Sequence, residues 1–92
     1  VRTGEAGDGD TVVVMGVGGI GINAVQGARI AGARVIVALD PIEYKRSRAL
    51  EFGATHTAAT VEEALSLVTD LTRGQLADVC VVSTDSAEGA YV

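Results

Sequence analysis

The stretch that decides the fold is residues 11–21, which read TVVVMGVGGIG. Its first five residues are a short β-branched run, and unbroken apolar character of this kind indicates a strand covered on both faces, as in a parallel sheet. Glycines at positions 16, 18 and 21 follow as a G-x-G-x-x-G motif between a predicted strand and a predicted helix. In that context the motif predicts a loop that binds the pyrophosphate of a dinucleotide.

Each position of this motif has a physical task. Gly16 allows the tight turn out of the strand, and Gly18 lacks a Cβ, so that the backbone can approach a pyrophosphate closely. Gly21 allows the helix to pack closely on the strand. The free N–H groups of the first helical turn, around Gly19 and Ile20, are expected to face the anion along the positive end of the helix dipole.

An acidic residue, Asp40, ends the second buried-strand pattern at residues 35–39 and lies nineteen residues after Gly21. That spacing is close to the value of about twenty at which an acid binds the adenosine ribose hydroxyls. A 2′-phosphate there would meet like charge, so Asp40 favours NAD over NADP. The alternative is that the glycines serve packing alone and that Asp40, before Pro41, caps a helix. The coincidence of three glycines with the acid favours nucleotide binding.

The helix after the loop is predicted to end at Gly32. Its sheet-facing side is expected to carry Ile20, Ala24, Ala28 and Ala31. A second helix is predicted over residues 41–52, stopped by Gly53, and a short third strand over residues 54–58.

A capping box predicts where the third helix begins, because Thr60 is followed three residues later by Glu63. The apolar residues that then hold helical spacing are Val61, Ala64, Leu65, Val68 and Leu71. Residues 79–82 form a fourth buried-strand pattern.

Alternation of strands and helices predicts an α/β fold, with a parallel sheet and helices on both faces. Right-handed crossovers give the four strands the order 3-2-1-4, which is a partial Rossmann fold. Residues 1–92 are therefore interpreted as the first, N-terminal half of a dinucleotide-binding Rossmann domain.

Composition excludes several classes of function. Twelve acidic residues against seven basic ones give a net charge of −5, and the only basic cluster, Lys45, Arg46 and Arg48, is too small for a nucleic-acid surface and is interpreted as a solvated helix face. One cysteine and one histidine, Cys80 and His56, cannot make a zinc site from these residue types alone, and both are interpreted as structural. No apolar run approaches the roughly 18 residues that span a bilayer, and no signal peptide is recognised, so we expect no membrane partner and a cytoplasmic location.

Four stretches of the sequence carry a family resemblance. The segments DTVVVM (residues 10–15), GVGGIGINAVQGARIAGA (16–33) and VIVALD (35–40) resemble the zinc-type alcohol dehydrogenases of the medium-chain dehydrogenase/reductase superfamily. The segment KRSRALEFGATHT (45–57) resembles the same family. Residues 26–29 are most similar to actinobacterial members, including the nitrosoaniline-dependent type. The resemblance extends from residue 8 to about residue 84.

This resemblance implies a two-domain, NAD-dependent enzyme that oxidises alcohols or reduces aldehydes. A zinc ion that polarises the substrate oxygen is expected only in a catalytic domain that precedes this segment and is absent from the chain. The family's pattern around the fourth strand is altered here, because Leu76, Val82 and Asp85 replace a Gly, a Glu and a Gly. That change weakens the assignment of the loop after the fourth strand, which falls on Ser83 and Thr84.

The expected site has no catalytic and no metal-binding residue, so the isolated chain is predicted to be inactive. The cofactor-binding residues, carried over from the motif and the family, are Gly16, Val17, Gly18, Gly19, Ile20, Gly21, Asp40, Lys45, Ser83 and Thr84. We expect NAD(H) as ligand and a homo-oligomer formed through the missing half of the domain. The alternatives are a regulatory nucleotide-sensing Rossmann domain of the potassium-transport type and a methyltransferase core that binds S-adenosylmethionine.

Overall fold

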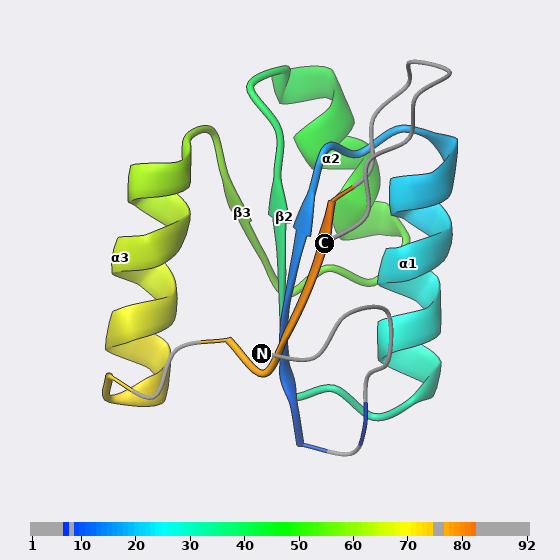
Figure 1. The fold of residues 1–92 in the computed structure, drawn as a ribbon. Helices are drawn as coiled ribbons and strands as arrows, with labels where there is room; N and C mark the ends of the chain where they lie inside the picture. Colours follow the sequence, from blue (N-terminus) through cyan, green and yellow to red (C-terminus); the bar gives the residue numbers. More distant parts are fainter. Residues whose placement is uncertain (1–6, 8, 75–76, 83–92) are drawn as a thin grey trace.

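The structure, a computed structural model, describes residues 7, 9–74 and 77–82. Strands and helices alternate along the described chain, and α1 and α2 cover one face of the sheet while α3 covers the other (Figure 1). The elements are β1 (Thr11–Met15), α1 (Gly19–Ile30), β2 (Val35–Leu39), α2 (Glu43–Glu51), β3 (His56–Ala58), α3 (Val61–Thr72) and β4 (Val79–Val82).

The four strands form one parallel sheet in the order β3-β2-β1-β4, which confirms the predicted topology. In the centre of the sheet, Val13 of β1 lies opposite Val37 of β2 on one side and Cys80 of β4 on the other. The order reverses between β1 and β4, because the chain leaves the β3 edge and crosses the sheet to pair β4 with β1. Such a reversal point is where open parallel sheets bind ligands.

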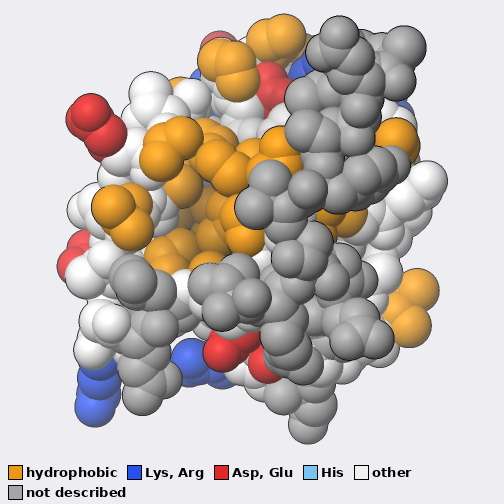
Figure 2. Space-filling view, in the orientation of Figure 1, with side chains coloured by type: hydrophobic (Ala, Val, Ile, Leu, Met, Phe, Trp, Pro, Cys, Tyr) orange, Lys and Arg blue, Asp and Glu red, His pale blue; other side chains and the backbone are white. Residues whose placement is uncertain are grey.

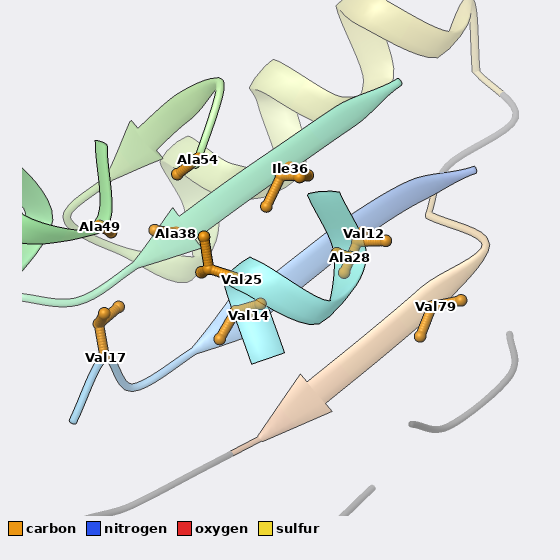
Figure 3. Packing of buried hydrophobic residues seen from close by; sticks show 10 residues of the cluster. All are labelled: Val12, Val14, Val17, Val25, Ala28, Ile36, Ala38, Ala49, Ala54 and Val79. Atoms are coloured by element: carbon orange, nitrogen blue, oxygen red, sulfur yellow. The ribbon is translucent and has the colours of Figure 1, made fainter. Parts of the chain in front are cut away.

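Two apolar clusters, one on each face, hold the helices to the sheet. Successive residues of a strand point to opposite faces, so Val12 and Val14 pack under α1 and α2 while Val13 packs under α3. Figure 3 shows the first cluster, in which Val25 and Ala28 of α1 lie against the strands. All five residues of β2 are buried, which confirms that this strand is covered on both faces.

Helix α1 is rotated relative to the sequence expectation. Its buried residues are Gly21, Val25 and Ala28, whereas Ile20 is 46% exposed. Of the predicted sheet-facing series, Ala28 is buried and Ala24 is half-buried against the same cluster, whereas the prediction was wrong at Ile20. Gly21 lies on the buried side, where the absence of a side chain lets the helix approach the sheet, and this places the series that starts at Gly21 against the strands.

Helix α2 is shorter than predicted and begins at Glu43 instead of residue 41. The Oδ1 atom of Asp40 accepts a hydrogen bond from the Ile42 N–H at 2.8 Å. This local turn holds Pro41 and Ile42 outside the helix. The third strand is also shorter and begins at His56, two residues later than predicted. Just before it, the Thr55 hydroxyl accepts a hydrogen bond from the Ile36 N–H at 2.9 Å.

Helix α3 begins as the capping box predicted, because the Thr60 Oγ1 accepts the Glu63 N–H at 3.1 Å. After α1, Gly32 has a φ of 88°, the left-handed conformation expected just beyond a helix end. No helix in the described part of the chain is long and apolar enough to cross a membrane.

Candidate functional site

The glycine loop and Asp40 lie at the same edge of the sheet, because each follows the carboxyl end of a parallel strand. Gly16 turns the chain out of β1 with a φ of 84°, a left-handed conformation that favours glycine. Its N–H donates a hydrogen bond to the Leu39 carbonyl at 2.8 Å, which ties the loop to the end of β2.

The amino end of α1 has no capping side chain. Gly18 is the N-cap residue and has no side chain that could accept hydrogen bonds from the free N–H groups of the first turn. That turn also contains no acidic residue. The positive end of this helix is therefore not balanced by its own cap, and an anion such as a phosphate fits such an end.

Asp40 connects the glycine loop to the start of α2. Its side chain is 4% exposed, and its Oδ2 accepts the buried Val17 N–H at 2.8 Å, while Oδ1 accepts the Ile42 N–H at 2.8 Å. The Asp40 carbonyl in turn accepts a hydrogen bond from Nη1 of Arg46 at 2.8 Å. The alternative of Asp40 as a helix cap is not what the structure shows, because the N-cap of α2 is Ile42 and has no capping side chain, and the bond to Val17 was not predicted. A carboxylate has about four acceptor positions, and these two backbone N–H groups occupy two of them on a side chain that is nearly buried.

An open cleft of about 650 Å³ lies between the glycine loop with the first turns of α1 on one side and α2 on the other. Its lining residues are Val17, Gly18, Gly19, Ile20, Ile22, Asn23, Tyr44, Lys45 and Arg48. The cleft thus brings Lys45 opposite the loop, whereas Gly21 and Asp40 are buried behind it. The expected residues Ser83 and Thr84 lie outside the described residues.

Arg48 is exposed, as the sequence predicted for a solvated helix face, and it also lines this cleft. Its Nη1 donates a hydrogen bond to the Tyr44 hydroxyl at 3.1 Å, and this bond raises the pKa of the guanidinium above its ordinary value. Its guanidinium carbon lies 5.9 Å from the Tyr44 ring centroid and 5.5 Å from that of Phe52. The available signal was the spacing of Tyr44, Arg48 and Phe52, which recur every four residues on one helix face.

The described residues offer no group of three or more His, Cys, Asp or Glu side chains that could hold a metal ion. The Nδ1 atom of His56 lies 2.8 Å from the Thr55 hydroxyl, at the beginning of β3. A zinc ion of the kind that the family resemblance implies therefore has no ligand set in this part of the chain.

A second hollow, of about 240 Å³, lies between α3 and the sheet, where hydrophobic side chains gather in Figure 2. Its lining residues are Val13, Met15, Leu39, Val61, Ala64, Leu65, Val68, Ala77 and Cys80. The thiol of Cys80 lies 3.7 Å from the Met15 sulfur, and burial raises the pKa of that thiol. Such a lining has no groups to orient a charged dinucleotide, so the cleft at the glycine loop is the candidate site.

Known proteins match this chain in sequence and in structure. A family model described as zinc-binding dehydrogenase matches residues 19–89. An NDMA-dependent alcohol dehydrogenase of Amycolatopsis methanolica is 56% identical over 75 residues, which cover 82% of this chain and 20% of that protein. Alcohol dehydrogenase B of Mycobacterium tuberculosis is 41% identical over 92 residues, which are 100% of this chain and 24% of that protein.

Among solved structures, an alcohol dehydrogenase from Thermotoga maritima superposes with a TM-score of 0.81 at 31% identity, covering 91% of this chain and 24% of that one. Alcohol dehydrogenase of Thermus sp. ATN1 gives a TM-score of 0.77 at 30% identity, covering 92% and 25%. The chain thus spans about a quarter or less of the length of these relatives. The alternative of a potassium-transport regulator is not supported by these matches.

Proposed function

The chain belongs to the zinc-binding dehydrogenase family, and we propose that it forms the first half of the NAD-binding domain of an alcohol dehydrogenase. In such an enzyme the bound nicotinamide exchanges a hydride with an alcohol or aldehyde. This chain's own residues would bind and orient the adenosine and pyrophosphate parts of the cofactor. Zinc ligands and the substrate pocket would come from other parts of the enzyme.

One observation carries this proposal, namely the cleft in which the uncapped amino end of α1 faces the cationic side of α2. The pyrophosphate would lie at Gly18, Gly19 and Ile20, where the free N–H groups of the first turn point toward an anion. The adenosine ribose would lie between Asp40 and Lys45. Because Asp40 is 4% exposed, it would reach the ribose only through the acceptor positions that the backbone does not occupy.

Several finer parts of the proposal stay predictions. Contacts from Ser83 and Thr84 to the adenine side of the cofactor stay predictions, as does a cytoplasmic location. Self-association stays a prediction that follows from the open edge of a sheet, because unpaired strand edges recruit further strands.

The deciding experiment is a calorimetric titration of the chain with NADH, NADPH and S-adenosylmethionine, repeated on Gly18→Ala. Gly18 has a φ of −94° and a ψ of −157°, an extended conformation that alanine can adopt, so the added methyl group is expected to obstruct the ligand while the loop keeps its backbone conformation. We expect saturable NADH binding that weakens about tenfold or more in this variant, as for a close backbone approach to pyrophosphate.

Gly27→Ala is the matched control, because it adds the same methyl group to α1 away from the cleft. A Cβ at Gly27 meets nothing within 4 Å, so NADH affinity should not change and the helix should gain roughly 0.5–1 kcal/mol. Equal loss of affinity in both variants, or no NADH binding by a folded chain, would refute the proposal. Preferential binding of S-adenosylmethionine would favour a methyltransferase core.

A further inference from the structure

We propose that Arg48 is a phosphate-contacting residue of the cofactor site, which extends the site beyond the glycine loop, Asp40 and Lys45. This inference rests on the proposed function, because it assigns a role within the same cleft. Arg48 lines the cleft together with Gly18 and Gly19, across from the amino end of α1.

Arg48 is held in place by its own helix before any ligand arrives. Tyr44 lies one turn before it and accepts a hydrogen bond at 3.1 Å, and the rings of Tyr44 and Phe52 lie within 6 Å of the guanidinium carbon. Contacts of this kind restrain a cation over an aromatic face. Because these contacts restrain the exposed side chain, less conformational entropy is lost when it binds an anion.

The chemistry of the guanidinium points to phosphate. The described part of the structure records one hydrogen bond from Arg48, to Tyr44, whereas a guanidinium has five N–H donors in a planar fork. A guanidinium group can bind two oxygens of one phosphate through two parallel N–H hydrogen bonds. The α1 dipole and Lys45 give the same cleft a positive potential, so a phosphate placed there would meet favourable charge from several directions.

The nearest acidic groups do not cancel this charge. Asp40 directs both carboxylate oxygens to backbone N–H groups and is 4% exposed. Glu51 is close enough to raise the pKa of Arg48, but it lies at the carboxyl end of α2 and does not line the cleft. Neither of these two carboxylates lines the cleft, whereas Arg48 and Lys45 do.

Two phosphates of a dinucleotide fit this description: the pyrophosphate, which NADH and NADPH share, and the 2′-phosphate, which only NADPH carries. The test compares the dissociation constants of ADP, adenosine, NADH and NADPH for the chain and for Arg48→Met, at two salt concentrations. Methionine keeps an apolar stem against Phe52 but removes the charge. The control is Arg34→Met, which removes the same charge just before β2, at the opposite end of the sheet.

We expect Arg48→Met to weaken ADP and NADH binding about five- to tenfold, in the range of an exposed charge-assisted contact, and to leave adenosine binding unchanged. The salt dependence of ADP binding should become shallower, because one screened ionic contact is lost. Arg34→Met should alter neither. Tyr44→Phe, which removes only the hydrogen bond to Arg48, should lower ADP affinity about twofold through weaker positioning.

The arms of the experiment separate the sources of the phosphate. An equal loss for NADH and NADPH assigns the contact to the pyrophosphate, and a larger loss for NADPH assigns it to the 2′-phosphate. Unchanged affinity for both ADP and NADPH, or an equal loss for adenosine, which indicates stacking on the base, would overturn the inference while the proposed NAD site stands. Failure of the folded wild-type chain to bind any of the four ligands would overturn both.

Discussion

Replacing Asp40 with alanine removes two hydrogen-bond acceptors from the junction of the glycine loop and α2. The Val17 N–H, which belongs to a residue that is 3% exposed, would lose its partner at 2.8 Å and would be left buried and unsatisfied. A buried donor without a partner costs about 1–3 kcal/mol. Ile42 is 50% exposed, so water can reach its N–H, and the lost turn before α2 adds about 0.5–2 kcal/mol, as for a helix cap.

Together these terms predict that Asp40→Ala lowers the free energy of unfolding by about 1.5–5 kcal/mol. For a domain of this size, about 1 kcal/mol corresponds to a fall of roughly 4–8 °C in Tm. Differential scanning calorimetry of the ligand-free chain measures this directly. Asp40→Asn should be intermediate, because its amide keeps one acceptor oxygen and places an NH₂ group against the second N–H donor.

Asp70→Ala is the control, since Asp70 is an exposed residue of α3 and its removal should change stability by no more than about 0.5 kcal/mol. A fall in Tm of less than about 2 °C for Asp40→Ala, equal to that of the control, would show that the two hydrogen bonds do not hold the loop. The carboxylate would then serve the ligand alone.

Two further predictions concern α3 and β4. Thr60→Ala removes the acceptor of the Glu63 N–H and should destabilise the chain by about 1 kcal/mol in urea unfolding; a cost equal to that of the exposed Thr69→Ala would contradict the role of the cap. Because burial raises the pKa of the Cys80 thiol, its alkylation at pH 8 should be slower in the folded chain than in urea. The free energy of unfolding should also fall as the pH rises above about 8.5, because the thiol of the unfolded chain ionises there while the thiol of the folded chain stays protonated. Equal alkylation rates in the two states would contradict this shielding.

The order of elements and the topology of the sheet were predictable because they depend on patterns with strong physical causes. Continuous apolar runs such as residues 11–15 predict a strand that is buried on both faces of the sheet. The right-handed crossover rule then fixes the order of the strands. The start of α3 was equally predictable, because the Thr-x-x-Glu pattern by itself specifies which side chain caps which backbone N–H. These features are local or depend on rules that hold for nearly all parallel sheets.

The start of α2 and the rotation of α1 were not predictable from local patterns. Helix α2 begins at Glu43 because Asp40 bonds to Ile42, and Asp40 is fixed in turn by Val17, twenty-three positions earlier. Helix α1 places Gly21 against the sheet and leaves Ile20 half-exposed. The periodicity of apolar residues favours Ile20 for the buried face instead, because its side chain is large and apolar. Both outcomes depend on how closely two segments approach each other, which a one-dimensional pattern does not contain.

The double attachment of Asp40 changes how the glycine motif and its acid should be tested. Loss of NADH binding in an Asp40 variant has two causes that act together, since the variant removes a ribose acceptor and also releases the Val17 N–H that shapes the phosphate loop. Such a result cannot separate ligand contact from loop geometry. Substitutions at Gly18 and Arg48 can, because the first keeps an extended backbone and the second changes an exposed side chain. If both substitutions weaken ADP binding while thermal stability is retained, the cleft recognises the ligand through Gly18 and Arg48. The structural task of Asp40 is then to hold the glycine loop next to the start of α2.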